Sequence, residues 1–224
     1  MRDNKASRMD SEDYLSRLLP HRLDAVAIAV LMLKFTLRWE EPKPTQIFVE
    51  GRLHFEGQTT MFTNPALEVG VLHARALLEF IGLKVNSGGR LIQLPANSRQ
   101  ADDAAIENIT GPAGALSLVS PDDAGAIYPI DAESARHALA GLIVAAHKGL
   151  AHSSATYFSS PGDASEIMFA LQLTQQLVER FVYAPLGRLR PPLPVEARRG
   201  VVRIYFIPPA QSPVGSHCRF TRAR

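Results

Sequence analysis

Two stretches of the chain decide its fold. They read PALEVGVLHARALLEFIGLK over residues 65–84 and DAESARHALAGLIVAAHKGLAH over residues 131–152. Apolar residues are so dense in both stretches that a helix would carry them around most of its circumference, which is typical of helices buried at the centre of a protein. Asn64 before Pro65, and Asp131, are residue types that commonly begin helices. The sequence therefore predicts two central helices here.

Two further helices are predicted around this pair. Apolar residues recur at helical spacing between Leu15 and Leu37, and Pro20 marks the start of a new helix or a kink, so we expect a helix over about residues 21–40. Ser160-Pro161 precedes a similar stripe, which predicts a helix over about residues 162–184. We therefore predict a mainly α fold, an up-down four-helix bundle, in one domain spanning residues 12–184.

The rest of the chain is predicted to be irregular. Short alternating stretches around two glycines favour a small hairpin at about residues 45–63. Residues 85–130, rich in turns, are interpreted as an irregular insertion between core helices. Residues 185–224 form a Pro- and Arg-rich C-terminal extension with one strand, Val201–Ile207, and we expect this extension to be partly disordered, from residue 208 onward.

The charge of the chain is unevenly distributed. The formal net charge is +2, but residues 185–224 hold eight arginines against one acid, Glu196, so this segment carries +7 and residues 1–184 carry −5. A basic end on an acidic body favours docking on an acidic partner or on phosphates, and the alternative is a solvated tail.

Composition excludes several classes of protein. A single cysteine, Cys218, rules out an intramolecular disulfide and a cysteine-based zinc site, and the seven scattered histidines form no typical metal motif. We therefore expect no metal and no cofactor. No phosphate-binding loop, nucleophile elbow or dinucleotide fingerprint is present. The longest early apolar run, Ala25–Leu33, is about half a membrane span, so a cytoplasmic protein without a membrane partner is expected.

Charged residues on the first central helix form one narrow stripe. Glu68, Arg75 and Glu79 fall within roughly 40° of one another at about 100° per residue, on a helix that is otherwise apolar. Two interpretations are open. The stripe is a solvated ridge with an ion pair between Arg75 and Glu79, or these two residues line a cleft between helices.

The second central helix ends in a cluster of basic residues. Lys148 and His152 are four residues apart and share a face, whereas His147 and His152 lie about 140° from each other on a regular helix. Cations at a helix C-terminus also interact favourably with the helix dipole, which is an alternative explanation of the cluster.

Leu72-His73-Ala74-Arg75-Ala76-Leu77-Leu78-Glu79-Phe80, followed by His147-Lys148-Gly149-Leu150-Ala151-His152, resembles two central helices of the HEPN superfamily of four-helix bundles. Many members of that superfamily are metal-independent endoribonucleases, and others are inactive binding modules. Their signature is an arginine followed, after four to six residues, by a histidine. His152 matches the histidine, but Ala145, Ala146 and His147 stand at the arginine positions.

The resemblance implies roles for particular residues. His152, His147 and Lys148 would form the catalytic set, in which a histidine transfers protons and a cation stabilises the phosphate. In the facing helix, three residues would contact phosphate or RNA, namely Arg75, Glu79 and His73. The resemblance also implies a homodimer and, for a toxin, an antitoxin-type protein partner.

Three functional hypotheses follow. The first is a HEPN-like, non-catalytic module that binds RNA, a nucleotide or a protein partner. The second is a metal-independent endoribonuclease, a toxin or defence component, that uses His152. The third is a helical structural or interaction protein unrelated to that superfamily.

Overall fold

The structure is a computed structural model that describes residues 11–95, 98–100, 103–147, 161–192 and 203–206. Its helical elements are α1 (Ser11–Asp13), the π-helical turn η1 (Tyr14–Leu18), α2 (Leu19–Thr36), α3 (Thr60–Ile81), the 3-10 turn η2 (Ile106–Asn108), α4 (Pro121–Gly125), α5 (Ala132–Ala145), α6 (Pro161–Val178) and the π-helical turn η4 (Glu179–Tyr183). Its strands are β1 (Pro44–Val49), β2 (Arg52–Gln58), β3 (Leu83–Val85), β4 (Leu91–Gln93), β5 (Thr110–Gly111), β6 (Gly114–Ala115) and β7 (Arg203–Phe206).

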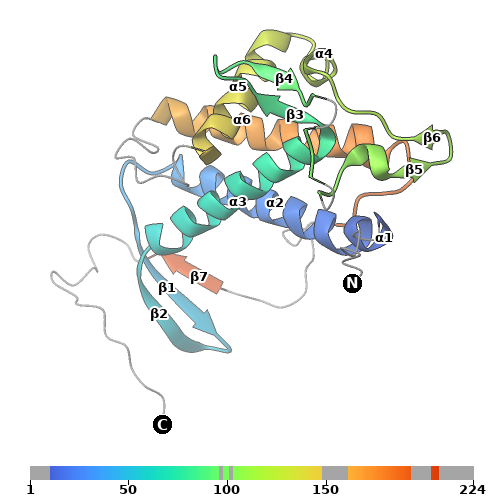
Figure 1. The fold of residues 1–224 in the computed structure, drawn as a ribbon. Helices are drawn as coiled ribbons and strands as arrows, with labels where there is room; N and C mark the ends of the chain where they lie inside the picture. Colours follow the sequence, from blue (N-terminus) through green and yellow to red (C-terminus); the bar gives the residue numbers. More distant parts are fainter. Residues whose placement is uncertain (1–10, 96–97, 101–102, 148–160, 193–202, 207–224) are drawn as a thin grey trace, which may run out of the picture.

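Four long helices form the body of the protein, which confirms the mainly α class. In Figure 1, α2 and α3 run in opposite directions side by side, with α5 and α6 behind them, and the β1–β2 hairpin lies at one end. Helix α6 packs against α2, α3 and α5 and closes a single continuous core. No helix in the described part of the chain is long and apolar enough to span a membrane.

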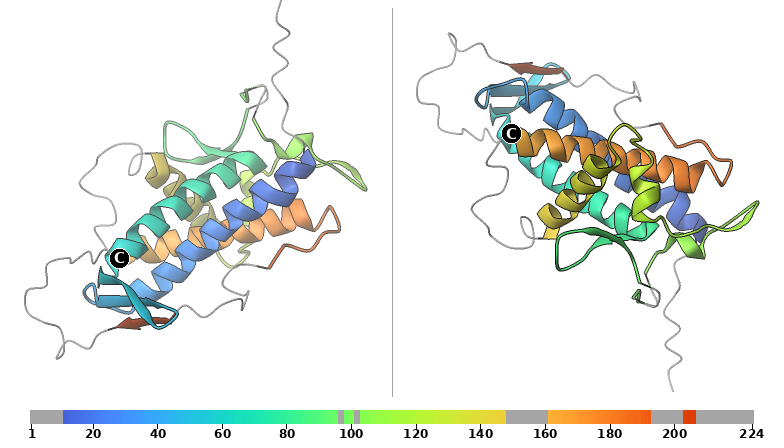
Figure 2. Two further views of the ribbon diagram at one scale, coloured as in Figure 1. Left: turned by 90° about the horizontal axis from the view of Figure 1, so that it is seen from below. Right: turned by 90° about the horizontal axis from the view of Figure 1, so that it is seen from above.

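Helix α5 departs from a regular up-down bundle. It is tilted against α6 in both Figure 1 and the right view of Figure 2. Helices α2, α3 and α6 instead lie roughly along one axis, in parallel or antiparallel orientation. The reason is that α5 also packs against α4, β3 and β4, which belong largely to the predicted insertion. Asp131 caps α5 as predicted, because its Oδ1 accepts a 2.9 Å hydrogen bond from the Ser134 amide.

The bounds of α3 differ from the prediction at both ends. The helix begins at Thr60, before Pro65, because the Thr59 carbonyl accepts hydrogen bonds from two amides of the first turn. Pro65 lies inside the helix and lacks the N–H that would bond the Met61 carbonyl, so the helix continues through it with one backbone hydrogen bond fewer. At the other end Gly82 has φ +101°, and this left-handed residue terminates the helix before Leu83.

The segment predicted as an irregular insertion contributes to the core. It contains β4, which pairs with β3, the small β5–β6 pair and α4, whose Ser120 and Asp123 form a capping box. The segment also contains the single turn η2, of which Ile106 is fully buried. The other core residues from this segment are Leu91, Ala105, Ile109, Val119 and Ala124.

The predicted hairpin and C-terminal strand belong to one sheet. Strands β1 and β2 pair in antiparallel register around a turn at Glu50 and Gly51, which both have positive φ. Strand β7 pairs with the other side of β1, giving the order β2-β1-β7. The C-terminal extension therefore returns to the end of the protein that carries the hairpin. The predicted disorder from residue 208 falls on residues outside those described.

Helices α2 and α3 approach each other very closely at one glycine. A Cβ atom built on Gly70 would lie 2.2 Å from Ala29 Cβ and 3.0 Å from the Ala25 carbonyl oxygen. Only a hydrogen atom fits between the two backbones at this point, since non-bonded carbon atoms are normally about 3.5–4.0 Å apart. Small residues on both helices therefore set the distance between them.

Replacing Gly70 with alanine tests this contact. Gly70→Ala should lower the free energy of unfolding by about 1–3 kcal/mol, because the new methyl group forces the two helices apart. Gly141 in α5 is the matched control, since a Cβ there meets no atom within 4 Å. Gly141→Ala should raise stability by up to about 1 kcal/mol. Urea unfolding measures both, and equal stabilisation by the two substitutions would contradict the close contact.

Candidate functional site

The predicted charged stripe on α3 contains a partly buried ion pair. Arg75 Nε lies 3.0 Å from Glu79 Oε1, and their side chains are 27% and 37% exposed. The ion-pair part of the prediction is thus confirmed, and such a pair contributes about 0.3–0.5 kcal/mol. Neither residue is among those that line the two pockets described below. The alternative, a cleft that Arg75 and Glu79 share with Lys148 and His152, stays a prediction.

The predicted catalytic set lies largely beyond the residues that the structure describes. Lys148 and His152 fall in the segment 148–160, outside the described ranges. His147 is exposed and follows the end of α5. The roles of these three residues therefore stay predictions.

His73, the third predicted phosphate contact, meets two basic residues of α2. Its Nδ1 lies 3.4 Å from Nη1 of Arg22, and its ring packs edge-on against the ring of His21 with centroids 5.3 Å apart. His21 is exposed, and Arg22 and His73 are partly buried. We call these three residues the His-Arg cluster. It is open to solvent on its His21 side.

Arg22 differs from other arginines of the protein in its partner. Within the described residues it forms no ion pair with a carboxylate, and its buried Nε has no hydrogen-bond acceptor. Five other arginines do bind carboxylates, namely Arg17, Arg75, Arg99, Arg136 and Arg188. The His-Arg cluster therefore contains a guanidinium charge that no described acid neutralises by direct contact.

Two buried tyrosines lie near the cluster. Burial raises the pKa of Tyr14 to about 12, against the opposing effect of the Arg22 and Arg99 guanidiniums. Burial likewise raises the pKa of Tyr183 to about 12, and its hydroxyl has no hydrogen-bond partner among the described residues. Both phenols are neutral at physiological pH, so they add hydrogen-bonding groups to this end of α2 without adding charge.

Asp24 interacts electrostatically with His21 of the cluster. Burial raises the pKa of its carboxyl group, while His21 and Arg190 act in the opposite direction. Arg190 also acts electrostatically on Tyr183, so the first arginines of the basic C-terminal segment lie close to this end of α2. Arg188 in turn binds Glu12 at 2.9 Å and holds the pKa of that carboxyl below its usual range.

The His-Arg cluster is arranged to keep His73 neutral. Partial burial is the main cause that lowers the pKa of His73, and the charges of Arg22 and His21 lower it further. A neutral His73 accepts a hydrogen bond from Arg22 at Nδ1 and carries its proton on Nε2. An anion bound between these side chains would raise the pKa of His73 again, because its negative charge would attract the protonated ring and offset the repulsion from Arg22 and His21.

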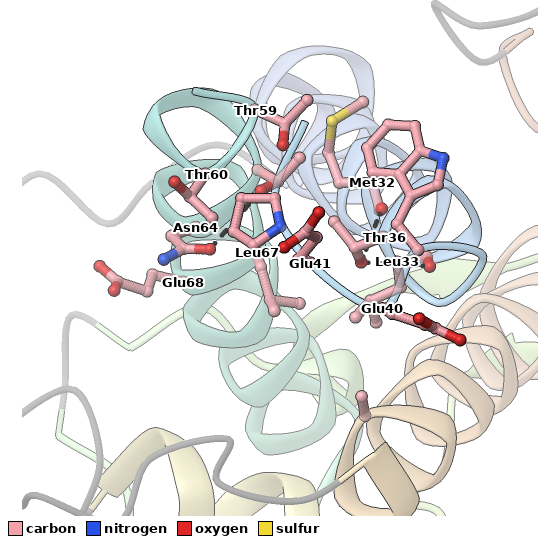
Figure 3. A pocket seen from close by; sticks show the side chains of 14 residues that line it. Met32, Leu33, Thr36, Glu40, Glu41, Thr59, Thr60, Asn64, Leu67 and Glu68 are labelled. Atoms are coloured by element: carbon pink, nitrogen blue, oxygen red, sulfur yellow. Dashed lines mark hydrogen bonds between the residues drawn. The ribbon is translucent and has the colours of Figure 1, made fainter. Parts of the chain in front are cut away.

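A pocket of about 490 Å³ lies between the end of α2 and the start of α3 (Figure 3). Apolar side chains and hydroxyl groups line it, and Glu40, Glu41 and Glu68 add three carboxylates. Figure 3 shows Glu40 and Glu68 on opposite sides with Glu41 between them. These carboxylates would repel a phosphate, so this pocket suits a neutral or cationic molecule.

A second hollow, of about 460 Å³, lies beside α5. It contains Arg90, Arg136 and His137. Its positive charge is partly neutralised, because Arg136 lies 2.7 Å from Glu133 and His137 lies 3.6 Å from Glu166. The His-Arg cluster therefore remains the stronger candidate for an anion.

The described residues contain no group of three or more His, Cys, Asp or Glu side chains that could hold a metal ion. No family model, curated protein or solved structure matches this chain. The resemblance to the HEPN superfamily therefore stays a prediction, and the site has to be judged on its own geometry.

His21 and Arg22 were not predicted from the sequence as site residues. A signal for Arg22 was present, because Arg22, Ala25 and Ala29 have the i, i+3, i+7 spacing of one helix face. An arginine in line with two small residues that contact a neighbouring helix must itself lie at that contact. The density of apolar residues in this segment hid the pattern.

The lowered pKa of His73 makes stability depend on pH. Its folded-state pKa lies below the ordinary 6.5, so the unfolded chain binds the proton more readily and stability is lost as pH falls below 6.5. We expect His73→Gln to remove this loss. Urea unfolding of both proteins between pH 5 and 8 measures it, and a difference that does not change with pH would contradict the assignment.

Proposed function

We propose that this protein is a non-catalytic binding module that recognises a phosphate-bearing ligand, RNA in the first place, through His21, Arg22 and His73. One observation carries the proposal. Arg22 faces two histidines instead of a carboxylate, and its Nε lacks an acceptor in the described part of the chain. A phosphate bound at the open side of the cluster supplies the negative charge that this arrangement lacks.

The basic C-terminal segment supports a polyanion over a small free anion. Residues 185–224 carry a net charge of +7, and Arg190 lies near Asp24 and Tyr183 beside the cluster. A nucleic acid bound at the His-Arg cluster would extend along neighbouring cations, whereas a single phosphate would occupy only the cluster. Contacts to several phosphates make RNA affinity decrease steeply with salt.

Fluorescence anisotropy with a labelled single-stranded RNA tests the proposal. Arg22→Gln and His73→Gln should each weaken binding, the first at least about tenfold, because a hydrogen bond to a charged group contributes about 1.5–3 kcal/mol. Arg17→Gln is the matched control: it removes the same charge from a side chain that is 79% exposed and pairs with Asp13. Its affinity should stay near that of the wild type.

Competition with a mononucleotide and with inorganic phosphate distinguishes RNA from smaller ligands. If the wild type binds none of the three saturably, or if both cluster variants bind as tightly as Arg17→Gln, the proposal is wrong. Recovery of the RNA in chelator separates binding from catalysis. Intact RNA fits a binding module, whereas cleavage that His152→Ala abolishes would favour the endoribonuclease hypothesis. An antitoxin-type protein partner stays a prediction.

A further inference from the structure

The pocket between the end of α2 and the start of α3 has the size and the lining of a small-molecule site. Its volume of about 490 Å³ lies within the range of about 300–1,000 Å³ that is typical of such sites. Leu33 of α2 and Leu67 of α3 both line it, so its apolar wall spans the two helices (Figure 3). Threonine side chains supply polar groups beside this wall. A ligand here would contact apolar and polar surface together.

The hydroxyl groups of this pocket favour a ligand that donates hydrogen bonds. Thr36 Oγ1 donates to the Met32 carbonyl at 3.1 Å, and Thr63 Oγ1, from a residue that is 7% exposed, donates to Asn64 Oδ1 at 3.5 Å. Because both protons are used within the chain, these two hydroxyls have only their lone pairs left for a ligand. Among the residues that the structure describes, no lysine, arginine or histidine lines this pocket.

Three carboxylates determine the charge of the pocket. Figure 3 shows Glu40 and Glu68 on opposite sides with Glu41 between them. Within the described ranges, Glu40 and Glu68 form no ion pair, and Glu41 lies 3.9 Å from the ammonium group of Lys43. Helix α2 ends and α3 begins at this pocket, so the two helix dipoles oppose each other here. The carboxylates therefore dominate, and they favour a ligand with several separated positive charges.

We infer that this pocket binds a linear aliphatic polyamine, with its ammonium groups at the carboxylates and its methylene chain against Leu33 and Leu67. An ammonium group donates up to three hydrogen bonds and accepts none, which matches the hydroxyl lone pairs of the pocket. The methylene groups between two ammonium groups gain from leaving water at the apolar wall. A metal ion carries the same kind of charge but has no apolar part that could use this wall.

The polyamine site is separate from the proposed phosphate site. His21 and Arg22 lie in the first turn of α2, whereas Leu33 and Thr36 lie in its last turn. The inference therefore does not rest on the proposed function. Arg22→Gln should leave polyamine binding unchanged, and a titration without RNA tests the polyamine site alone.

Titration of the full chain with spermidine, followed by calorimetry and tryptophan fluorescence, tests the inference. Trp39 is the only tryptophan of the chain and lines the pocket, so binding there should change its emission. Glu40→Gln and Glu68→Gln should each raise the dissociation constant about two- to fivefold, the usual effect of one exposed ion pair. Glu179→Gln is the matched control, because it removes an exposed carboxylate from η4, beyond the far end of α6. It should leave the dissociation constant unchanged.

Two further probes separate a polyamine site from simple attraction of cations. Butylamine has one ammonium group on an apolar chain, and magnesium has charge without a chain. Spermidine should bind at least about fivefold more tightly than either, because its linked ammonium groups bind together. The inference is overturned if spermidine does not bind saturably, or if butylamine or magnesium binds as tightly. It is equally overturned if Glu40→Gln and Glu68→Gln, shown by circular dichroism to be folded, both bind spermidine like Glu179→Gln.

Discussion

The close contact between α2 and α3 at Gly70 is the constraint on which the rest of the structure depends. Because Gly70 has no side chain, Ala25 and Ala29 lie directly against the backbone of α3. The two helices are antiparallel, so the residue three positions before Ala25 and the residue three positions after Gly70 are found at the same end of the pair. These residues are Arg22 and His73, which meet at 3.4 Å. Helix packing thus brings the basic side chains together.

The same packing explains the charge of the site. The five arginines named above bind carboxylates. Arg22 instead lies at the contact between two helices, where its neighbours are histidines and the buried phenol of Tyr14. Keeping His73 neutral reduces the repulsion within the cluster but leaves the guanidinium charge uncompensated by direct contact. A site of this kind gains most from an anion that enters from the open side.

The sequence was sufficient to predict elements with a regular pattern. Apolar periodicity predicted the four long helices, and Asp131 marked the start of α5 correctly. Helix ends were less predictable. Gly82 ends α3 with its left-handed conformation, whereas the predicted helix continued to residue 84, where the turn-rich residues begin. Burial of Ile106 could not be predicted, because it depends on contacts between distant segments.

The candidate site was predicted only in part, for a related reason. His73 was predicted as a phosphate contact because it lies in the segment that resembles a HEPN helix. Its partner Arg22 is 51 residues away in the sequence and contacts it only through tertiary packing. The ion pair between Arg75 and Glu79, which was one of the two interpretations of the charged stripe, could be foreseen because that contact is local to one helix. Local interactions can be predicted from spacing, and contacts between helices require the fold.

The most direct test of the central claim, that His21, Arg22 and His73 form an anion site, is a titration followed by histidine-ring NMR. The account predicts that His73 is neutral at pH 7 with its proton on Nε2, and that inorganic phosphate shifts the ring signals of His21 and His73 selectively among the seven histidines. Ring signals of His21 and His73 that do not change with phosphate, or change no more than those of the other five histidines, would contradict it.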